Sequence, residues 1–436
     1  MRKFVYLCEI CIEILLKNKK YDPKSMKKIL TLMLMTALSS AAMAAKTLTV
    51  TVSNPMNVAR TDVPVVISLK NYGDIRSALV TSQADGQEVP CQLDDLDQDE
   101  QFDELCFLAN LGKKEKRQYR IELSDEGAPR SYPARVYAEM VLGNSRDKKL
   151  KKHQQNNYIE AITARGDAAY TYNIQHHHGV DFESELNGIR IYFDARQTLD
   201  LYGKFKKQLE LKETQFYTPD DLKAKGYGDD VLWVGQTFGL GAFRGWNGQQ
   251  PTLVEPVRSR TQRVISYGPL RAIVEVVDRG WQADAQKAPV NMTLRYTQYA
   301  GHRDTDVDVL FNKDVTDYRF STGIINVKGS EEFTDKKGLR ACWGTDYPAA
   351  DTVKWKRETV GLAVLVPQQN IASEEPANKD NYGYVLKVNG NKMAYKVTYT
   401  SANEEFGYHS AKEWFDYLKE WKREVEKPVV VAIKEN

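Results

Sequence analysis

The stretch from His176 to Asp194, HHHGVDFESELNGIRIYFD, decides how this chain folds. Side chains two residues apart in a strand share a face, and the second half of the stretch alternates apolar and polar residues. The apolar set is Ile189, Ile191 and Phe193, and the polar set is Arg190, Tyr192 and Asp194. This alternation predicts a strand with one face on a core and one polar face. Gly179, directly after the histidines, predicts that the histidines lie in a loop before this strand.

The next segment, TLDLYGK at 198–204, repeats the pattern with Asp200, Tyr202 and Lys204 on one face. Two neighbouring strands would thus gather Arg, Tyr, Asp and Lys side chains on one surface. Such a surface is either a structural ladder of salt bridges and hydrogen bonds or the floor of a binding site for a polar ligand. Clusters of ionisable groups favour the second interpretation without excluding the first.

Short alternating segments with turns between them continue along most of the chain and predict an all-β fold. We expect a small N-terminal β-sandwich at 46–130, a Gly/Pro-rich linker, and a large antiparallel domain at 135–436 in which two curved sheets pack face to face. QLELKETQFY, at 208–217, is expected to be one of its strands. Two short helices interrupt the strands, one begun by TPDD at 218–221 and one from Ser410 to Arg423 with Trp414, Leu418 and Trp421 on one face.

Three consecutive histidines and two glutamates are the first candidates for acid–base chemistry. A loop before the strand would present His177, or else His176, over the sheet, where an imidazole can exchange a proton near neutral pH. Their consecutive spacing is not that of a zinc site. Glu183 and Glu185 share a face if 181–186 is extended. They would then lie ~6–7 Å apart, a separation used by glycosidase carboxylate pairs.

Two further segments carry candidate ligand contacts. His302 and Arg303 follow a predicted strand, and Arg303 could hold a carboxylate with two parallel hydrogen bonds. The glycine-rich stretch 234–246 has no nucleotide-binding context, and it carries Arg244, Trp246 and two phenylalanines. These aromatic residues either stack on a ligand or form a hydrophobic plug.

An acidic segment, DLDQDEQFD at 95–103, resembles a calcium-binding loop. Asp95, Asp97, Asp99 and Asp103 match positions 1, 3, 5 and 9 of such a loop. Glu100 replaces the usual glycine at position 6, and Cys106 replaces the usual glutamate at position 12. A structural calcium ion is the one cofactor that the sequence suggests, and an acidic hairpin tip is the alternative.

The first 45 residues predict an exported protein. Met26-Lys27-Lys28, an apolar run and Ala42-Met43-Ala44 form a signal peptide, which suggests translation from Met26 and a periplasmic or secreted location. Outside this leader the chain carries 53 basic and 56 acidic residues, so its charge predicts no nucleic-acid partner, and no later segment predicts a membrane span. Export permits a Cys91–Cys106 disulfide; two buried thiols are the alternative. Cys342 reads as a small buried hydrophobic residue.

Several motifs resemble a family of exported Bacteroidetes proteins of unknown function. They are HHGVDFESEL (177–186), RIYFD (190–194), TLDLYGK (198–204), GYGDDVLWVGQTFGLG (226–241), YGPLRAIVEV (267–276), RTDVPVVISL (60–69) and DDLDQDEQFDEL (94–105). The chain departs from the pattern at Asn187-Gly188-Ile189, where the family has a bulkier residue. The resemblance implies a galactose-mutarotase-like β-supersandwich and a periplasmic role beside enzymes that degrade pectin and other uronates.

The expected function is therefore action on an acidic oligosaccharide. For a lyase, Arg190 or Arg303 would neutralise the uronate, and His177 or Tyr192 would remove the proton from C5. For a glycoside hydrolase, Glu183 or Glu185 would act with Asp194. A sugar-binding protein without catalysis would use the same surface. The wider set of expected substrate contacts is Arg190, Asp200, Tyr202, Lys204, Arg244, Trp246, His302 and Arg303.

Overall fold

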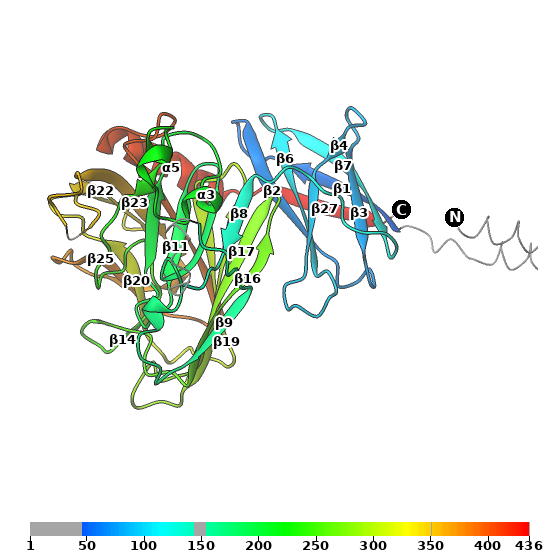
Figure 1. Cartoon of the computed structure of the whole chain (residues 1–436). Coiled ribbons are helices and arrows are strands. Elements are labelled where there is room, and N and C mark those ends of the chain that lie inside the picture. Colours follow the sequence, from blue (N-terminus) through cyan, green and yellow to red (C-terminus); the bar gives the residue numbers. More distant parts are fainter. Residues whose placement is uncertain (1–45, 144–153, 350, 436) are drawn as a thin grey trace, which may run out of the picture. The chain divides into compact units, whose positions relative to one another are not determined.

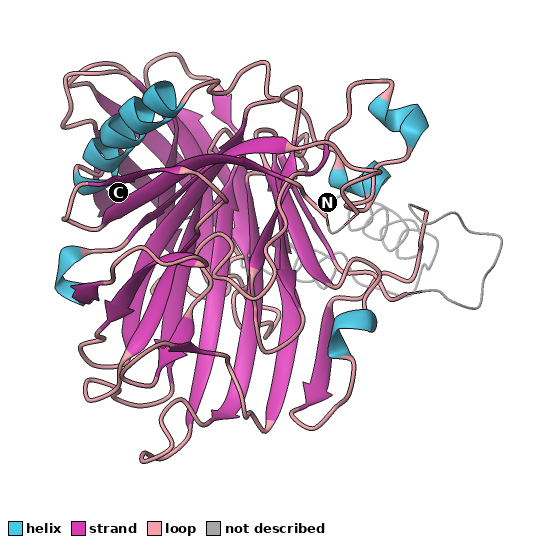
Figure 2. Cartoon of the chain, turned by 90° about the vertical axis from the view of Figure 1, so that its left-hand side faces the viewer, coloured by secondary structure: helices cyan, strands magenta, loops and turns pink. Residues whose placement is uncertain are grey.

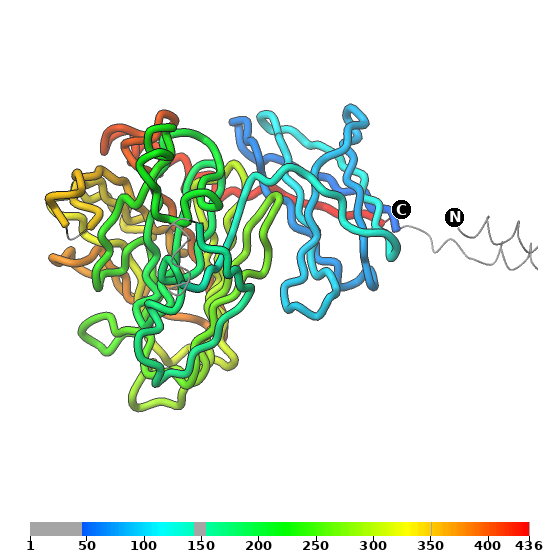
Figure 3. The backbone as a smooth tube through the Cα atoms, in the orientation of Figure 1, coloured from blue at the N-terminus to red at the C-terminus, as the bar shows by residue number. Residues whose placement is uncertain are grey.

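The computed structural model describes residues 46–143, 154–349 and 351–435. The predicted signal peptide and leader lie outside these residues. From Thr47 onward the chain forms one compact unit, and Figures 1 and 3 trace its path from blue to red. The described residues are mostly β-strand, in antiparallel sheets, which confirms the predicted all-β class.

The first part is a sandwich of a five-stranded sheet, in the order β27-β1-β7-β3-β4, and a three-stranded sheet, β2-β6-β5. Its strands are β1 (Lys46–Ser53), β2 (Arg60–Ser68), β3 (Ser77–Ser82), β4 (Glu88–Val89), β5 (Cys91–Asp94), β6 (Glu104–Leu111), β7 (Lys116–Ser124) and β27 (Val430–Glu435). The last strand of the chain, β27, pairs with β1 (red beside blue in Figure 1). The N-terminal sandwich therefore includes residues that the sequence places with the second domain.

Cys91 and Cys106 are both free and buried. Cys91 lies opposite Phe107, and Cys106 lies opposite Gln92. Because consecutive residues of a strand point to opposite faces, the two sulfurs lie on different faces of the sheet. The disulfide alternative is therefore wrong, and the buried-thiol alternative is confirmed. Cys342 is also fully buried.

The larger part has three sheets that share one hydrophobic core. A nine-stranded sheet has the order β21-β22-β23-β26-β19-β18-β17-β16-β9, and its long central strands lie side by side in Figure 2. Its strands are β9 (Ala161–Arg165), β16 (Ser259–Tyr267), β17 (Arg271–Trp281), β18 (Val290–Tyr299), β19 (Asp304–Phe311), β21 (Glu331–Thr334), β22 (Leu339–Asp346), β23 (Glu358–Leu365) and β26 (Lys392–Ser401).

Two five-stranded sheets contribute the other side chains of this core. One has the order β13-β12-β11-β10-β8, with β8 (Val136–Glu139), β10 (Gly179–Ser184), β11 (Gly188–Tyr192), β12 (Leu199–Gly203) and β13 (Asp229–Asp230). The other has the order β15-β14-β20-β25-β24, with β14 (Arg244–Trp246), β15 (Pro251–Thr252), β20 (Phe320–Ile325), β24 (Ile371–Glu374) and β25 (Asn381–Leu386).

The long helix α5 (Ala411–Glu426) matches the prediction closely. Ser410 is its N-cap, and its side chain accepts a hydrogen bond from the Glu413 N–H, which satisfies a backbone donor of the first turn. Trp414, Leu418 and Trp421 are buried against β22 and β23. Helix α4 (Asp220–Lys223) also forms, with Pro219 at its N-cap position.

The expected strand at 208–217 is wrong. Its centre forms a short helix, α3 (Leu211–Thr214), and Gln215 and Phe216 then adopt positive φ angles of 46° and 64°. The N–H groups of Glu210 and Leu211 donate to the Glu183 carboxylate at 2.8 Å. The Glu183 carboxylate therefore accepts, at the start of a helix, backbone N–H groups that would bond to a neighbouring strand if this segment were extended.

Among the described residues, no helix has both the length and the apolar composition needed to cross a bilayer.

Candidate functional site

The polar face of the sheet β13-β12-β11-β10-β8 carries the charged residues that the sequence singles out. Ile189, Ile191 and Phe193 are buried in the core, as predicted. On the opposite face, Arg190 lies directly across from Asp200 on one neighbouring strand and from Asp181 on the other. This face is not exposed to solvent, because Arg190, Asp181 and Asp200 are all buried.

Arg190 is the centre of a buried hydrogen-bond network. Its Nη2 donates to Asp200 at 2.7 Å and to Asp230 at 3.0 Å. The Tyr192 hydroxyl donates to the same Asp200 oxygen at 2.5 Å. The guanidinium also lies 4.1 Å from the ring centre of Phe216, in a cation–π geometry. The network confirms the predicted proximity of Arg190, Tyr192 and Asp200, and it adds Asp230.

Asp230 and Tyr192, two members of this network, have raised pKa values. Burial and the neighbouring Asp200 raise the pKa of Asp230 well above its ordinary value, against the opposing effect of Arg190. Burial and Asp200 also raise the pKa of Tyr192. A carboxyl group with a raised pKa is better suited to act as a general acid. Asp230 is therefore a proton-donor candidate.

The network forms the floor of a pocket of about 190 Å³. Its walls are the aromatic rings of Tyr172, Tyr192, Tyr217, Trp233 and Trp355, the charged residues Arg190, Arg196, Asp200 and Asp230, and Leu232, Val234, Gly235, Pro348 and Ala349. Trp233 is 53% exposed, an unusual state for a ring of this size. Larger cavities of about 460 and 430 Å³ lie elsewhere, but neither combines several aromatic rings with a buried cluster of this kind.

Arg196 lines this pocket and pairs with Asp194, which is not among the lining residues. Arg196 donates to Asp194 at 2.8 Å and 2.6 Å. Its guanidinium lies 5.0 Å and 4.7 Å from the ring centres of Tyr172 and Tyr192. The Arg196 side chain is 19% exposed, against 5% for Arg190. Arg196 is thus the more accessible of the two guanidinium groups.

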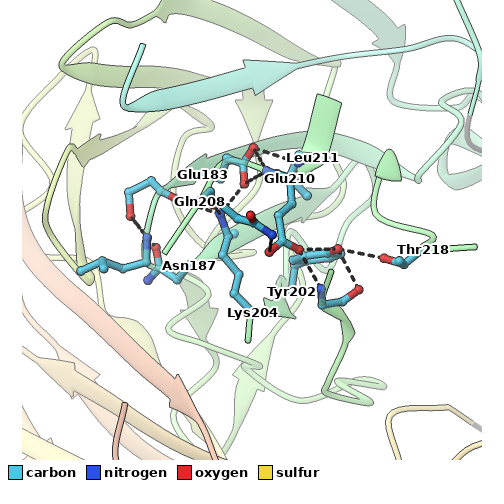
Figure 4. Close-up of polar contacts among 12 residues, drawn as sticks. Glu183, Asn187, Tyr202, Lys204, Gln208, Glu210, Leu211 and Thr218 are labelled. Atoms are coloured by element: carbon cyan, nitrogen blue, oxygen red, sulfur yellow. Dashed lines mark hydrogen bonds and ion pairs between the residues drawn. The ribbon is translucent and has the colours of Figure 1, made fainter. Parts of the chain in front are cut away.

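Glu183 and Lys204 form a separate buried ion pair, and Figure 4 shows both residues with Glu210 and Leu211 from the start of helix α3. The Lys204 ammonium donates to Glu183 at 2.5 Å, to the Ser184 carbonyl at 2.7 Å and to the Gln208 carbonyl at 2.6 Å. Both side chains are 0% exposed. Burial raises the pKa of Glu183 despite Lys204 and the backbone donors. The geometry places neither residue in the pocket.

Tyr202 secures the segment after helix α3. Its hydroxyl contacts Glu210 at 3.0 Å, Thr218 at 2.8 Å and the Gly228 carbonyl at 2.8 Å (Figure 4). These contacts hold both ends of the segment that carries Phe216 and Tyr217. Tyr202 therefore supports the pocket wall from beneath and does not line the pocket.

The histidine loop faces the interior of the protein. His177 is 0% exposed, and its Nδ1 lies 2.9 Å from the Gly179 carbonyl oxygen. The His176 ring packs edge-on against Tyr217, and the His178 ring stacks on Tyr172 at 3.8 Å. The loop thus supports two aromatic residues of the pocket, while His177 itself is not among the residues that line it.

Glu185, His302 and Arg303 lie outside the pocket. Strand β10 ends at Ser184, so Glu185 turns away from Glu183 and accepts hydrogen bonds from Arg135 at 2.5 Å and from the Gly301 N–H at 2.8 Å. Arg303 is buried and donates to Glu404 at 2.7 Å. His302 bridges Asp304 and the Asp62 carbonyl at 3.2 Å and 2.8 Å. All three therefore serve contacts within the protein.

The glycine-rich stretch is a hydrophobic plug. Phe238 and Phe243 are 1% and 0% exposed. Arg244 donates to the carbonyls of Gln236 and Thr237 at 2.9 Å and 2.6 Å, and burial lowers its pKa to about 10. Trp246 belongs to strand β14 and is not among the residues that line the aromatic pocket.

The acidic loop brings three of its four aspartates together. Asp95, Asp97 and Asp99 each offer an oxygen atom within 4.8 Å of the others. Asp103 accepts the Leu96 N–H at 2.7 Å. Glu100 has φ 70°, the left-handed conformation that the glycine of a calcium loop supplies.

Several pocket residues were not singled out from the sequence: Tyr172, Arg196, Tyr217, Asp230, Trp233 and Trp355. Asp230 and Trp233 do lie within GYGDDVLWVG, part of a motif that carries the family resemblance. That motif was the one sequence signal that could have identified these two residues. Tyr172 and Trp355 lie in segments without periodicity, so only the tertiary fold brings them to the pocket.

Comparison with known proteins gives a family but no activity. No curated protein matches the sequence. Among solved structures, a protein of glycosyl hydrolase family 38 from Enterococcus faecalis is similar, with 10% identity and a TM-score of 0.44. The similarity covers 92% of this chain and 49% of that one, so the chain spans about half the length of this relative. Residues 52–431 match the profile described as a domain of unknown function, DUF4861, and the chain belongs to this family.

Proposed function

We propose that this protein acts on an acidic oligosaccharide and that the aromatic pocket holds one sugar unit of it. The observation that carries the proposal is the combination of five aromatic rings with a buried Arg190–Asp200–Asp230 cluster in one pocket. Ring faces suit the apolar faces of sugars, and buried carboxyl groups suit proton transfer at a glycosidic bond. The cavity is smaller than the roughly 300–1,000 Å³ of drug-sized sites, which favours a single ring.

Arg196 is the proposed contact for a uronate carboxylate. It lies on the pocket wall between Tyr172 and Tyr192, and its partner Asp194 is also partly exposed. A planar guanidinium binds a carboxylate with two parallel hydrogen bonds. Arg190 is less accessible and already donates to Asp200, Asp230 and two tyrosine hydroxyls. We therefore assign Arg190 to holding the two aspartates in place.

The first proposed reaction is β-elimination. Arg196 neutralises the uronate, which makes the proton on C5 more acidic. Tyr192 Oη takes that proton while its own proton passes to Asp200, so no free phenolate is needed and the raised pKa of Tyr192 is compatible with the step. The bond from C4 to O4 breaks, a C4–C5 double bond forms, and Asp230 gives its proton to O4.

Hydrolysis is the second candidate, and the two aspartates that line the pocket, Asp200 and Asp230, support it. Asp230 would again protonate the leaving oxygen, and Asp194 or Asp200 would receive the proton of the attacking water. Glu183 and Glu185 have structural roles, so we assign the catalytic carboxylates of this reaction to aspartates at the pocket instead. His177 likewise gives way to Tyr192 as the proposed base, because Tyr192 lines the pocket and His177 does not.

We also propose export and a structural calcium ion. The signal-peptide pattern at 26–44 supports a periplasmic or secreted location. The family resemblance implies a setting of pectin degradation in Bacteroidetes. The clustered oxygens of Asp95, Asp97 and Asp99 support calcium binding at the acidic loop.

The test is incubation of the protein with pectic and other uronate oligosaccharides, followed by ultraviolet absorbance of the unsaturated uronate and mass spectrometry. Absorbance with no gain of water indicates elimination, and gain of water without absorbance indicates hydrolysis. Asp230→Asn should lower either activity by about 10²-fold or more. Tyr192→Phe should abolish elimination alone. Asp97→Asn, in the acidic loop, is the matched control and should keep full activity.

The outcomes separate the alternatives. Binding without product on any substrate would reject both reactions and leave a sugar-binding protein. Activity that survives in both Asp230→Asn and Arg196→Gln would reject the assigned pocket. Arg165→Gln is the matched arginine control, because its side chain is 82% exposed and lies outside the pocket.

A further inference from the structure

A row of four charged residues crosses the polar face of the sheet β13-β12-β11-β10-β8. Glu139 lies opposite Asp181, Asp181 lies opposite Arg190, and Arg190 lies opposite Asp200. Directly opposed residues of antiparallel strands lie about 4.5–5.5 Å apart at Cβ, and like charges in such pairs are destabilising. Glu139 and Asp181 are such a pair, and both are buried.

The charges at the two ends of this row are balanced differently. At one end, Arg190 is shared by Asp200 and Asp230. Lys204, which is also buried, is held by Glu183 and two carbonyls. No lysine or arginine among the described residues forms an ion pair with Glu139 or Asp181. Burying two carboxylates without a cation is strongly unfavourable.

His177 lies between these two carboxylates. Its Nε2 is 3.4 Å from Glu139 Oε1 and 3.4 Å from Asp181 Oδ2. Its Nδ1 lies 2.9 Å from the Gly179 carbonyl oxygen, an acceptor, so Nδ1 carries the proton. In neutral imidazole the Nε2 lone pair is then free for a ligand.

Four buried atoms here have no hydrogen-bond partner within the described part of the chain: Glu139 Oε1, His177 Nε2, and both carboxylate oxygens of Asp181. One ligand atom from each of the three residues lies within 4.8 Å of the others. Ligands about 2.1 Å from one ion at tetrahedral angles are separated by about 3.4 Å. The observed distances from Nε2 to the two carboxylates have this value.

We propose that Glu139, His177 and Asp181 bind a divalent transition-metal ion, with Zn²⁺ as the first candidate. One nitrogen and two carboxylate oxygens suit Zn²⁺, and two negative charges balance its charge. Tyr137 donates to Glu139 Oε2 at 2.7 Å, and Gly179 fixes the imidazole tautomer. Such outer contacts orient metal ligands.

The ion has a structural role in this proposal, because all three ligands are buried. It would join strand β8, strand β10 and the histidine loop. The same loop carries His178, which stacks on the pocket residue Tyr172 with ring planes 8° apart. The ion would therefore fix one wall of the aromatic pocket. The metal site stands on its own contacts, whatever reaction that pocket supports.

The test measures the metal content of the folded full chain, purified without chelators and then incubated with Zn²⁺, Mn²⁺ or Fe²⁺. We expect about one equivalent of one transition metal by mass spectrometry. His177→Gln and Asp181→Asn should reduce this to under a tenth. His409→Gln, an exposed histidine on another segment, should keep the full equivalent. The double variant Asp95→Asn/Asp97→Asn should also keep it, which excludes the acidic loop.

The wild-type chain alone keeps the proposal falsifiable if the variants do not fold. Removal of the metal with a strong chelator should lower the melting temperature, and one equivalent of metal should restore it. Co²⁺ in place of the native ion should give visible ligand-field bands. A wild-type chain that binds none of the three ions and gives no Co²⁺ bands would overturn the proposal, and shared protons would then hold the cluster. Full metal content in folded His177→Gln would overturn it as well.

Discussion

Replacing Lys204 with methionine should destabilise the fold severely. Methionine keeps most of the aliphatic stem but removes the ammonium group, which donates to Glu183 and to two carbonyls. Breaking a buried ion pair by removing one partner costs about 3–5 kcal/mol. Glu183 keeps its hydrogen bonds from the Glu210 and Leu211 N–H groups and can take up a proton, since burial raises its pKa. We therefore expect Lys204→Met to lower the free energy of unfolding by about 3 kcal/mol, the lower end of that range.

A double-mutant cycle separates this pair from general damage. Glu183→Gln alone leaves a buried ammonium with only carbonyl and amide acceptors, so it should also cost about 3 kcal/mol. Lys204→Met with Glu183→Gln should cost less than the sum of the single changes, by about 1–3 kcal/mol. Lys412→Met, which removes an exposed pair with Asp416 on helix α5, is the control and should change stability by under about 0.5 kcal/mol.

The assay is equilibrium denaturation in urea, followed by tryptophan fluorescence. A loss below about 1 kcal/mol in Lys204→Met, or strictly additive effects in the cycle, would refute the structural role of the pair. The catalytic interpretation of Glu183 predicts the reverse pattern, with full stability and lost turnover in Glu183→Gln. Because the Glu183 carboxylate accepts the N–H groups at the start of helix α3, we also expect Lys204→Met to disturb Tyr217 and weaken sugar binding in the pocket that Tyr217 lines.

Three further predictions concern other parts of the molecule. Burial opposes protonation of His302, but Asp304 and the Asp62 carbonyl raise its pKa overall. The protonated His302 should therefore stabilise the fold fully below the ordinary histidine pKa of about 6.5. This stabilisation should disappear as the pH rises through the raised pKa. Urea titrations should thus show a larger deficit for His302→Gln at acidic than at alkaline pH, and a constant deficit would contradict this. Calcium should raise the melting temperature of the wild type but not of Asp97→Asn. Titration calorimetry that gives no heat of calcium binding would contradict the proposed calcium site in the acidic loop. Cys91 and Cys106 should react with a thiol reagent only after unfolding, since both are buried; a native chain that lacks free thiols when denatured would show that they are oxidised.

The sequence predicted the faces of strands β11 and β12 because strand periodicity is a local property. Ile189 and Ile191 face the core, and Arg190 meets Asp200 across the ladder as expected. The partner of Lys204 could not be predicted in the same way. Lys204 comes after strand β12, and its partner Glu183 lies two strands away on β10, so their contact depends on the covering segment at 205–218.

The error at 208–217 has the same origin. LELKE alternates in the way that a strand does, but its N–H groups find the Glu183 carboxylate, which local patterning does not reveal. Asp230 was missed for a related reason. It lies on a strand of only two residues, and its pKa is raised by burial and by Asp200, which is thirty positions earlier in the chain.

The burial of the polar face explains which of its charges can be functional. We expected a half-exposed sheet, on which charged residues need no partners because water solvates them. In the structure this face is covered, so each ionised group requires a counter-charge or a hydrogen bond. Glu183 has Lys204, and Asp200 has Arg190. Two sets of acidic groups are less well compensated.

Asp230 shares Arg190 with Asp200 and lines the pocket. It can balance its burial by holding a proton, which is the property that a general acid needs. Within the described residues, Glu139 and Asp181 form no ion pair with an arginine or a lysine. Both are buried, and the His177 imidazole directs its Nε2 lone pair at them. One proton cannot balance two carboxylates, whereas one divalent ion can. The same sheet face thus favours proton transfer at one end and metal binding at the other.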